Sequence, residues 1–186
     1  MNRSCMMCMA PAAALVWFVG VGLVGCSTAP KTEVDRRTLE HEAEQTIARF
    51  KEEDPSMQAR FDEAVGWAVF PTVGKGAIGV GGAYGKGVLY EGGDMVGYCD
   101  LSQGSIGFAL GGQAYSELIF FQHESALQEF KAGTMTFAAQ ASAVAATAGA
   151  STDADYESGV LVFTMPKGGL MYEASIGGQN FDFVPK

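Results

Sequence analysis

The pattern of apolar and polar positions divides this chain into three parts. Residues 10–24 are apolar and uncharged, but this stretch is shorter than a helix that crosses a bilayer. Residues 33–65 are rich in charge and carry apolar side chains every three or four positions, which predicts amphipathic helices. From residue 66 onward, short apolar runs alternate with glycine clusters, a pattern typical of strands and tight turns.

Two helices are predicted in the charged part. The first covers about residues 33–53, and the second follows Asp54 and Pro55, because an acidic N-cap followed by proline is a common helix start. Packing on the protein's own domain is favoured over packing on a membrane, since the polar face is rich in glutamate and membrane-surface helices prefer lysine and arginine there. The apolar stripe of the first helix consists of Leu39, Ala43, Ile47 and Phe50.

The glycine-rich part predicts a largely antiparallel sheet, because its apolar runs follow one another too closely for crossover helices. The pair Gly92-Gly93 lies between two such runs and indicates a hairpin. Residues 135–150 are rich in alanine, serine and threonine, and we expect them to form a small-residue helix. The predicted fold class is α+β: a strongly twisted or barrel-like sheet with the N-terminal helices and the small-residue helix packed on it.

The start of the chain is interpreted as a signal peptide over residues 1–25. Arg3 makes it positively charged, and Leu23 to Cys26 resemble the cleavage box of bacterial lipoproteins. That resemblance implies that Cys26 carries acyl chains such as palmitate and that residues 26–32 form a tether. With Ser27 next to the cysteine, it also implies sorting to the outer membrane of a Gram-negative cell. Two or more acyl chains would hold the protein stably on the periplasmic face.

Composition limits the partners of the mature protein. Without residues 1–25, 11 basic and 21 acidic residues remain, so the net charge is −10. This charge argues against nucleic acid and against broad adhesion to anionic lipid. Cys99 is then the single cysteine beside the anchor Cys26, so we expect no intramolecular disulfide and a buried, inert thiol.

The motifs of catalysis and cofactor binding are incomplete. Residues 74–79 match the G-x-G-x-x-G pattern, but strand-like sequence follows them instead of the helix that a dinucleotide site requires. His41 and His123 have neither the spacing of a metal site nor a nucleophile motif beside them. We therefore expect no enzyme, no cofactor and no metal.

Five glycine-rich blocks keep a fixed order along the sequence: Gly66–Pro71, Lys75-Gly76, Gly79–Gly87, Gly111–Phe121 and Lys167–Ser175. Together they resemble the SYLF domain family over roughly residues 56–184, within an expected single domain at 33–186. The resemblance implies a lipid-binding module, whose eukaryotic members bind phosphoinositides and whose fungal branch also binds actin. Those members use a basic N-terminal segment, whereas the equivalent stretch here is rich in glutamate, and an actin partner does not fit a periplasmic protein.

For this sequence, the resemblance implies a local site for a lipid head group. Lys75 and Lys86 with Tyr84 beside them, joined by Lys167, would hold one phosphate among glycine amides. The alternative is that these lysines only make the surface turns hydrophilic and bind no ligand. The preferred hypothesis is a membrane-anchored lipoprotein that binds phospholipid or another amphiphile at the cell envelope. The alternative is a structural or interaction lipoprotein that docks an unidentified protein partner without lipid selectivity.

Overall fold

The computed structural model of the chain describes residues 29–78, 80–106, 111–137, 142–168 and 174–186. The predicted signal peptide and the predicted acylation of Cys26 lie outside these residues. No described helix is long and apolar enough to cross a membrane.

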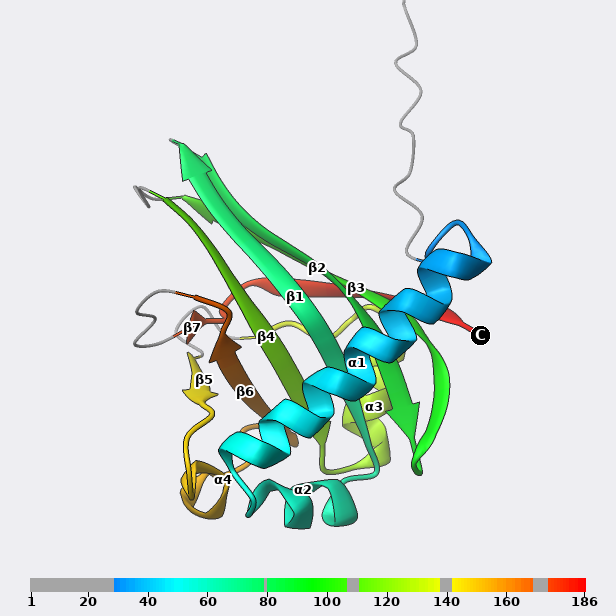
Figure 1. Cartoon of the computed structure of the whole chain (residues 1–186), viewed down its shortest axis with the longest axis vertical. Helices are drawn as coiled ribbons and strands as arrows, with labels where there is room; N and C mark the ends of the chain where they lie inside the picture. Colours follow the sequence, from blue (N-terminus) through cyan, green and yellow to red (C-terminus); the bar gives the residue numbers. More distant parts are fainter. Residues whose placement is uncertain (1–28, 79, 107–110, 138–141, 169–173) are drawn as a thin grey trace, which may run out of the picture.

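The N-terminal helices form as the sequence predicts. Helix α1 covers Glu33–Glu53 and begins at Thr32, whose hydroxyl accepts a hydrogen bond from the backbone N–H of Asp35 at 3.1 Å. Helix α2 covers Met57–Glu63, so its predicted start is wrong: Ser56 and not Asp54 stands at the N-cap position, and Pro55 lies in the turn before the helix. Their apolar stripes pack on the protein itself: Leu39, Ala43 and Phe50 of α1 are buried. Figure 1 shows α1 lying across one face of the sheet, with α2 below it.

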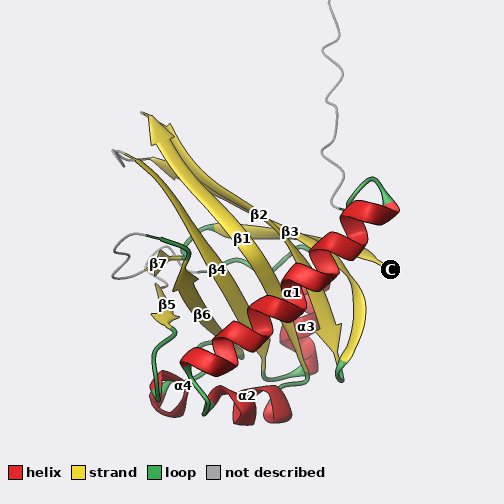
Figure 2. Cartoon of the chain, in the orientation of Figure 1, coloured by secondary structure: helices red, strands yellow, loops and turns green. Residues whose placement is uncertain are grey.

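The remaining elements build an α+β fold with a mostly antiparallel sheet (Figure 2). The described strands follow the order β7-β5-β6-β4-β1-β2-β3-β8, and β5–β6 is the parallel pair among them. Gly92 and Gly93 make the β2–β3 turn with φ of 57° and 94°, which confirms the predicted hairpin. The elements are β1 (Gly66–Ile78), β2 (Val80–Glu91), β3 (Asp94–Ile106), β4 (Gly111–Phe121), α3 (Glu124–Lys131), β5 (Ser142–Ala145), α4 (Ala150–Asp153), β6 (Val160–Pro166), β7 (Ala174–Ser175) and β8 (Gln179–Pro185).

The sheet curls like a barrel. Strands β7 and β8 stand at opposite ends of the strand order, yet only residues 176–178 separate them along the chain. A side-chain hydrogen bond also crosses the interior, from Gln179 Nε2 on β8 to Glu117 Oε2 on β4, at 3.1 Å. Because β8 and β4 are not neighbours in the sheet, this contact requires the two strands to face each other across the curl. The barrel-like expectation is confirmed.

The predicted small-residue helix over residues 135–150 is wrong. Residues 142–145 form strand β5, which lies beside β6 with the Ala146 N–H donating to the Thr164 carbonyl at 2.9 Å. Only the short helix α4 follows, at Ala150–Asp153. Alanine strongly favours a helix, but intrinsic propensity is a weak determinant of structure, and the pairing of this segment with β6 overrides it. Residues 138–141 lie outside the described part.

Two apolar clusters fill the two sides of the curled sheet. The outer cluster lies between the sheet and helices α1 and α2, and includes Phe50, Phe61 and Phe120. The inner cluster lies within the curl, where α3 adds Leu127 and Phe130. Since strand side chains alternate between faces, Leu118 and Phe120 of β4 belong to the outer cluster and Tyr115 and Ile119 to the inner one. This alternation decides which polar residues can meet.

A buried polar group interrupts the inner cluster. Glu117 is fully buried on the inner face, between Tyr115 and Ile119, and Gln179 faces it from β8. Among the described residues, Oε1 of Glu117, Oε1 of Gln179 and the Tyr115 hydroxyl have no hydrogen-bond partner. Burial raises the pKa of the Glu117 carboxyl to about 8, although its contacts with Gln179 and Tyr115 oppose the rise. At neutral pH the carboxyl is therefore mostly protonated.

A hydrogen-bonded clasp joins the helices to the α4 segment. The buried Asp54 carboxylate accepts from the backbone N–H groups of Ser56, Gly149 and Ser151, at 3.1, 3.1 and 2.7 Å, and from the Ser56 hydroxyl. Burial alone would raise the pKa of Asp54, but these hydrogen bonds lower it to about 2. Arg60 of α2 completes the clasp by donating to the carbonyls of Ser151 and Ala154.

Candidate functional site

The outer face of β2 and β3 carries a polar cluster next to the N-terminal half of α1. Lys86 Nζ lies 3.2 Å from Asp100 Oδ1, and the Tyr84 hydroxyl donates to Asp100 Oδ2 at 3.2 Å. Asp100 and Lys86 are cross-strand partners, and Tyr84 follows one step along the same face. The Lys86 ammonium also lies 5.9 Å from the centre of the Tyr84 ring. These three side chains form one connected group, the Lys86 cluster.

The Lys86 cluster keeps its charges despite partial burial. Burial raises the pKa of Asp100, and the contact with Lys86 opposes that rise. Burial would lower the pKa of Lys86, but the contacts with Tyr84 and Asp100 outweigh it and raise the pKa. The Asp100 side chain is only 7 % exposed and that of Lys86 is 35 % exposed. The carboxylate thus holds a lysine at the surface in a fixed place.

A hollow of about 290 Å³ opens beside the Lys86 cluster. It lies between the segment that precedes α1 and the first turns of that helix, where the Arg36 Nε–H donates to the Pro30 carbonyl at 3.3 Å. Its volume is close to the lower end of the range for small-molecule sites. The hollow is lined by Ala29, Pro30, Lys31, Asp35, Leu39 and Lys86.

Exposed apolar side chains surround the same end of α1. Val34, Tyr84 and Val184 are the exposed large apolar residues of the described part, at 72, 46 and 37 %. Val34 lies in the first turn of α1, and Tyr84 belongs to the Lys86 cluster. Val184 pairs with Tyr98, whose hydroxyl donates to Glu40 of α1 at 2.7 Å. These three side chains, called the apolar rim below, lie on elements close to the hollow, which itself contains charged groups.

The predicted head-group residues do not all meet. Tyr84 and Lys86 lie together, as expected. Lys167 reaches the same face, because its Nζ contacts the Thr72 hydroxyl at 2.5 Å and Thr72 is the cross-strand partner of Lys86. Lys75 pairs with Ala83, so it lies on the inner face of the sheet, opposite to Tyr84 and Lys86. The structure therefore separates Lys75 from the other three residues.

Sequence reasoning missed Lys31, Asp35 and Asp100 of this site. A role for Asp100 could have been predicted, because it is a lone carboxylate within the apolar run 95–101. The strand register of the β2–β3 hairpin places it opposite a lysine. Lys31 and Asp35 carried no signal, since a tether and the exposed first turn of a helix both contain charges by default. Their meeting with Lys86 depends on how α1 crosses the sheet.

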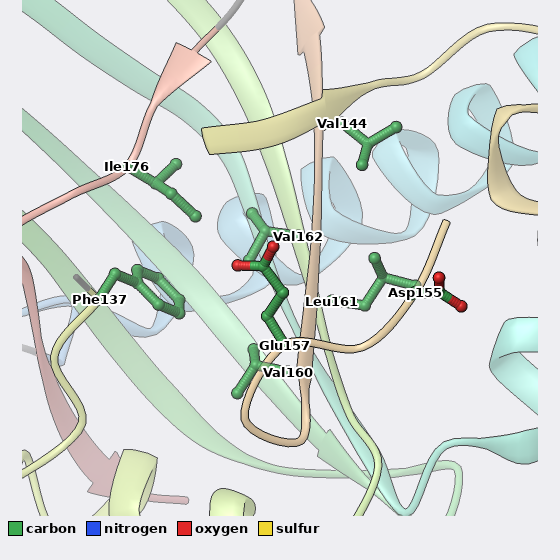
Figure 3. Close-up of a pocket in the computed structure, with 8 residues that line it drawn as sticks. All are labelled: Phe137, Val144, Asp155, Glu157, Val160, Leu161, Val162 and Ile176. Atoms are coloured by element: carbon green, nitrogen blue, oxygen red, sulfur yellow. The ribbon is translucent and has the colours of Figure 1, made fainter. Parts of the chain in front are cut away.

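A second pocket lies at the other edge of the sheet (Figure 3). Glu157 points into it, whereas Asp155 points away from its apolar wall. Its volume is about 70 Å³, too small for a lipid head group or a drug-sized ligand. The pocket is lined by Phe137, Val144, Asp155, Glu157, Val160, Leu161, Val162 and Ile176.

The described part of the chain shows where the residues of the incomplete metal, thiol and cofactor motifs lie. No three histidine, cysteine, aspartate or glutamate side chains gather there as a metal site would require. Cys99 is a free, buried thiol, as predicted, and burial raises its pKa further. Residues 74–78 of the glycine motif lie inside strand β1 and not at a strand-to-helix turn.

Part of the chain is similar to a known protein family. Residues 102–183 match the Ysc84 (SYLF) domain family, described as Las17-binding protein actin regulator. Two blocks that carry the SYLF resemblance, Gly111–Phe121 and Lys167–Ser175, fall within this match. Ysc84 is not an enzyme family. The matched region supplies β4, β6 and most of β8, whereas the hollow is lined by residues 29–31, α1 and β2, which lie outside the match.

A curated relative extends the similarity toward the N-terminus. The chain is 25% identical over 156 residues to "Beta cell expansion factor A" of Aeromonas veronii. The aligned part covers 82% of this chain and 59% of that protein, so the chain spans about three fifths of its relative's length.

Proposed function

We propose that this protein binds phospholipid or another amphiphile at the cell envelope, with the hollow beside the Lys86 cluster as its contact site. The observation that carries this proposal is the coincidence of three features at one end of α1. A hollow, an apolar rim and lysine side chains lie together there, and Ala29 forms part of the wall of the hollow. A surface of this kind suits a molecule with an apolar part and a charged head.

The proposed lipid anchor would place this end against the membrane. Cys26 stands three residues before Ala29, so an extended chain between them spans about 10 Å at most. Acyl chains on Cys26 would therefore bring Val34, Tyr84 and the hollow to the bilayer surface. We place the protein on the periplasmic face of the outer membrane, held by acylated Cys26.

The charges around the hollow support selective contact and not general adhesion. Arg37 pairs with Glu33 at 3.2 Å, and Lys186 pairs with Glu40 at 3.4 Å. Lys86 is compensated by Asp100. Within the described part of the chain no carboxylate pairs with Lys31. The surface around the hollow is thus close to neutral. In this proposal, the individual charged side chains inside the hollow contact the lipid head group.

The alternative function is the docking of a protein partner without lipid selectivity. The Ysc84 family description favours it, because that description names a protein that the family binds. In this case the apolar rim would contact a protein surface, and lipid composition would have no effect.

The lipid proposal predicts that vesicles bind the protein without its anchor. We expect residues 27–186 to co-sediment with phospholipid vesicles. The double variant Lys31→Glu with Tyr84→Ser should weaken this binding on the order of tenfold, because it removes one unpaired cation and one exposed ring from the site. Co-sedimentation across neutral and anionic vesicles measures the effect.

Lys75→Glu is the matched control. It makes the same charge change as Lys31→Glu, but on the inner face of the sheet, and should leave vesicle binding unchanged. If residues 27–186 bind no vesicle of any composition, the domain does not recognise lipid. Loss of a co-purified protein in the double variant would then favour the docking alternative.

A further inference from the structure

Two opposite charges share the hollow without pairing. Lys31 and Asp35 both line it and both are exposed. In the described residues, no carboxylate lies within ion-pair distance of Lys31 and no cation within that distance of Asp35. The backbone N–H of Asp35 donates to Thr32, which fixes the start of the helix and leaves the Asp35 carboxylate free to accept. A ligand can therefore meet a cation and an anion at once.

The third charge of the hollow, Lys86, strengthens the positive side. Asp100 and Tyr84 hold its side chain in place, so little side-chain entropy is lost when a ligand binds. Lys31 and Lys86 together suit a phosphate oxygen, and Asp35 suits an ammonium group. Ala29, Pro30 and Leu39 supply the apolar wall between these charges.

From this arrangement we infer that the hollow recognises a zwitterionic head group that carries a phosphate and a primary ammonium, as in a phosphoethanolamine lipid. The inference rests on the proposed function and names the class of lipid. An anionic head group without an amine would leave Asp35 unpaired and facing a phosphate of like charge. The acidic chain, with a net charge of −9, adds to that repulsion.

The chemistry at Asp35 separates primary from quaternary amines. A primary ammonium donates three hydrogen bonds, and a carboxylate accepts them at close range. A quaternary ammonium donates none and is held instead by a cage of aromatic rings. Tyr84 contacts Lys86, and none of the described residues that line the hollow is aromatic. The site therefore favours ethanolamine over choline.

Soluble head groups test this inference apart from membrane binding. The full chain with Cys26→Ser, kept in one non-ionic detergent, is titrated with glycerophosphoethanolamine, glycerophosphocholine and glycerophosphoglycerol, and binding is followed by ligand-observed NMR. We expect the ethanolamine compound to bind on the order of tenfold more tightly than the other two. Asp35→Asn should remove this preference, while Lys31→Gln should weaken all three compounds.

Asp62→Asn is the matched control, because Asp62 is an exposed aspartate on α2, beyond the far end of the 21-residue helix α1. It should leave all three affinities unchanged. Equal binding of the three compounds, or an unchanged preference in Asp35→Asn, would overturn the inference even if vesicles bind. Binding of glycerophosphoethanolamine without binding of vesicles would support the head-group chemistry but refute the membrane role. The two proposals therefore fail in different experiments.

Discussion

Replacing Glu117 with glutamine is expected to stabilise the protein by about 4 kcal/mol near pH 9 and to change little near pH 5. The unfolded chain loses the Glu117 proton near its ordinary pKa of 4.5, whereas the folded protein keeps it up to about pH 8. Between these values the folded state binds more protons than the unfolded state. The free energy of unfolding therefore falls as the pH rises through this window.

Glutamine removes this dependence because it is neutral at every pH. It also keeps a carbonyl oxygen that can accept from Gln179 Nε2, and it has nearly the same volume as glutamate. Urea unfolding of the wild type and of Glu117→Gln at about pH 5, 7 and 9 measures the effect. The wild type should lose stability across the series and the variant should not.

Glu157→Gln is the control for this series. Glu157 is exposed, so its replacement should leave the downward slope of the wild type unchanged. Parallel curves for the wild type and Glu117→Gln would show that the carboxyl at position 117 is not proton-bound in the folded protein.

Breaking the Asp54 clasp should have the opposite effect, a loss of about 3 kcal/mol at pH 7 in Asp54→Ala. The substitution leaves the N–H groups of Gly149 and of the buried Ser151 without the acceptor that they share. Chemical unfolding measures the loss, and faster hydrogen exchange at residues 149–154 locates it. Asp153→Ala, in the same segment but exposed, should be nearly neutral.

The clasp also predicts a response to acid. The folded pKa of Asp54 is lowered from 3.8 to about 2, so its contribution is complete above pH 4 and is lost as the pH falls through 2. The wild type should lose about 2 kcal/mol in this range from Asp54. Asp54→Ala should show a shallower acid slope, and an equally steep slope would mean that the clasp does not hold a charged carboxylate.

The sequence predicted the local features of the fold well. Periodic apolar positions identified α1, and Gly92-Gly93 identified the β2–β3 hairpin. Residues 142–145 were missed as a strand, because their small side chains carry no period and their pairing with β6 is decided by distant residues. The intrinsic propensity of a segment predicts its secondary structure where the side chains are large. Where they are small, pairing with distant strands determines the secondary structure.

The candidate site was predicted only in part, for a similar reason. Glycine-rich sequence suggested Tyr84 and Lys86, but assigning a face to Lys75 requires the register of β1 against β2. The burial of Glu117 could have been predicted from the sequence. This carboxylate alternates with Tyr115 and Ile119 on one face of a strand that is apolar on both faces. The cluster around it depends on β8, which comes more than 60 residues later.

The place of β8 in the strand order has a consequence for how the chain acquires its structure. Strands β1, β2 and β3 can pair as they are made, because each hairpin joins neighbours in sequence. The free edge of β3, however, is covered only by residues 179–185. During folding β3 therefore presents unpaired backbone groups until residues 179–185 have paired with it. A nascent chain without β8 has an open edge, which keeps closure late and offers that edge to chaperones or to other copies before the sheet is complete.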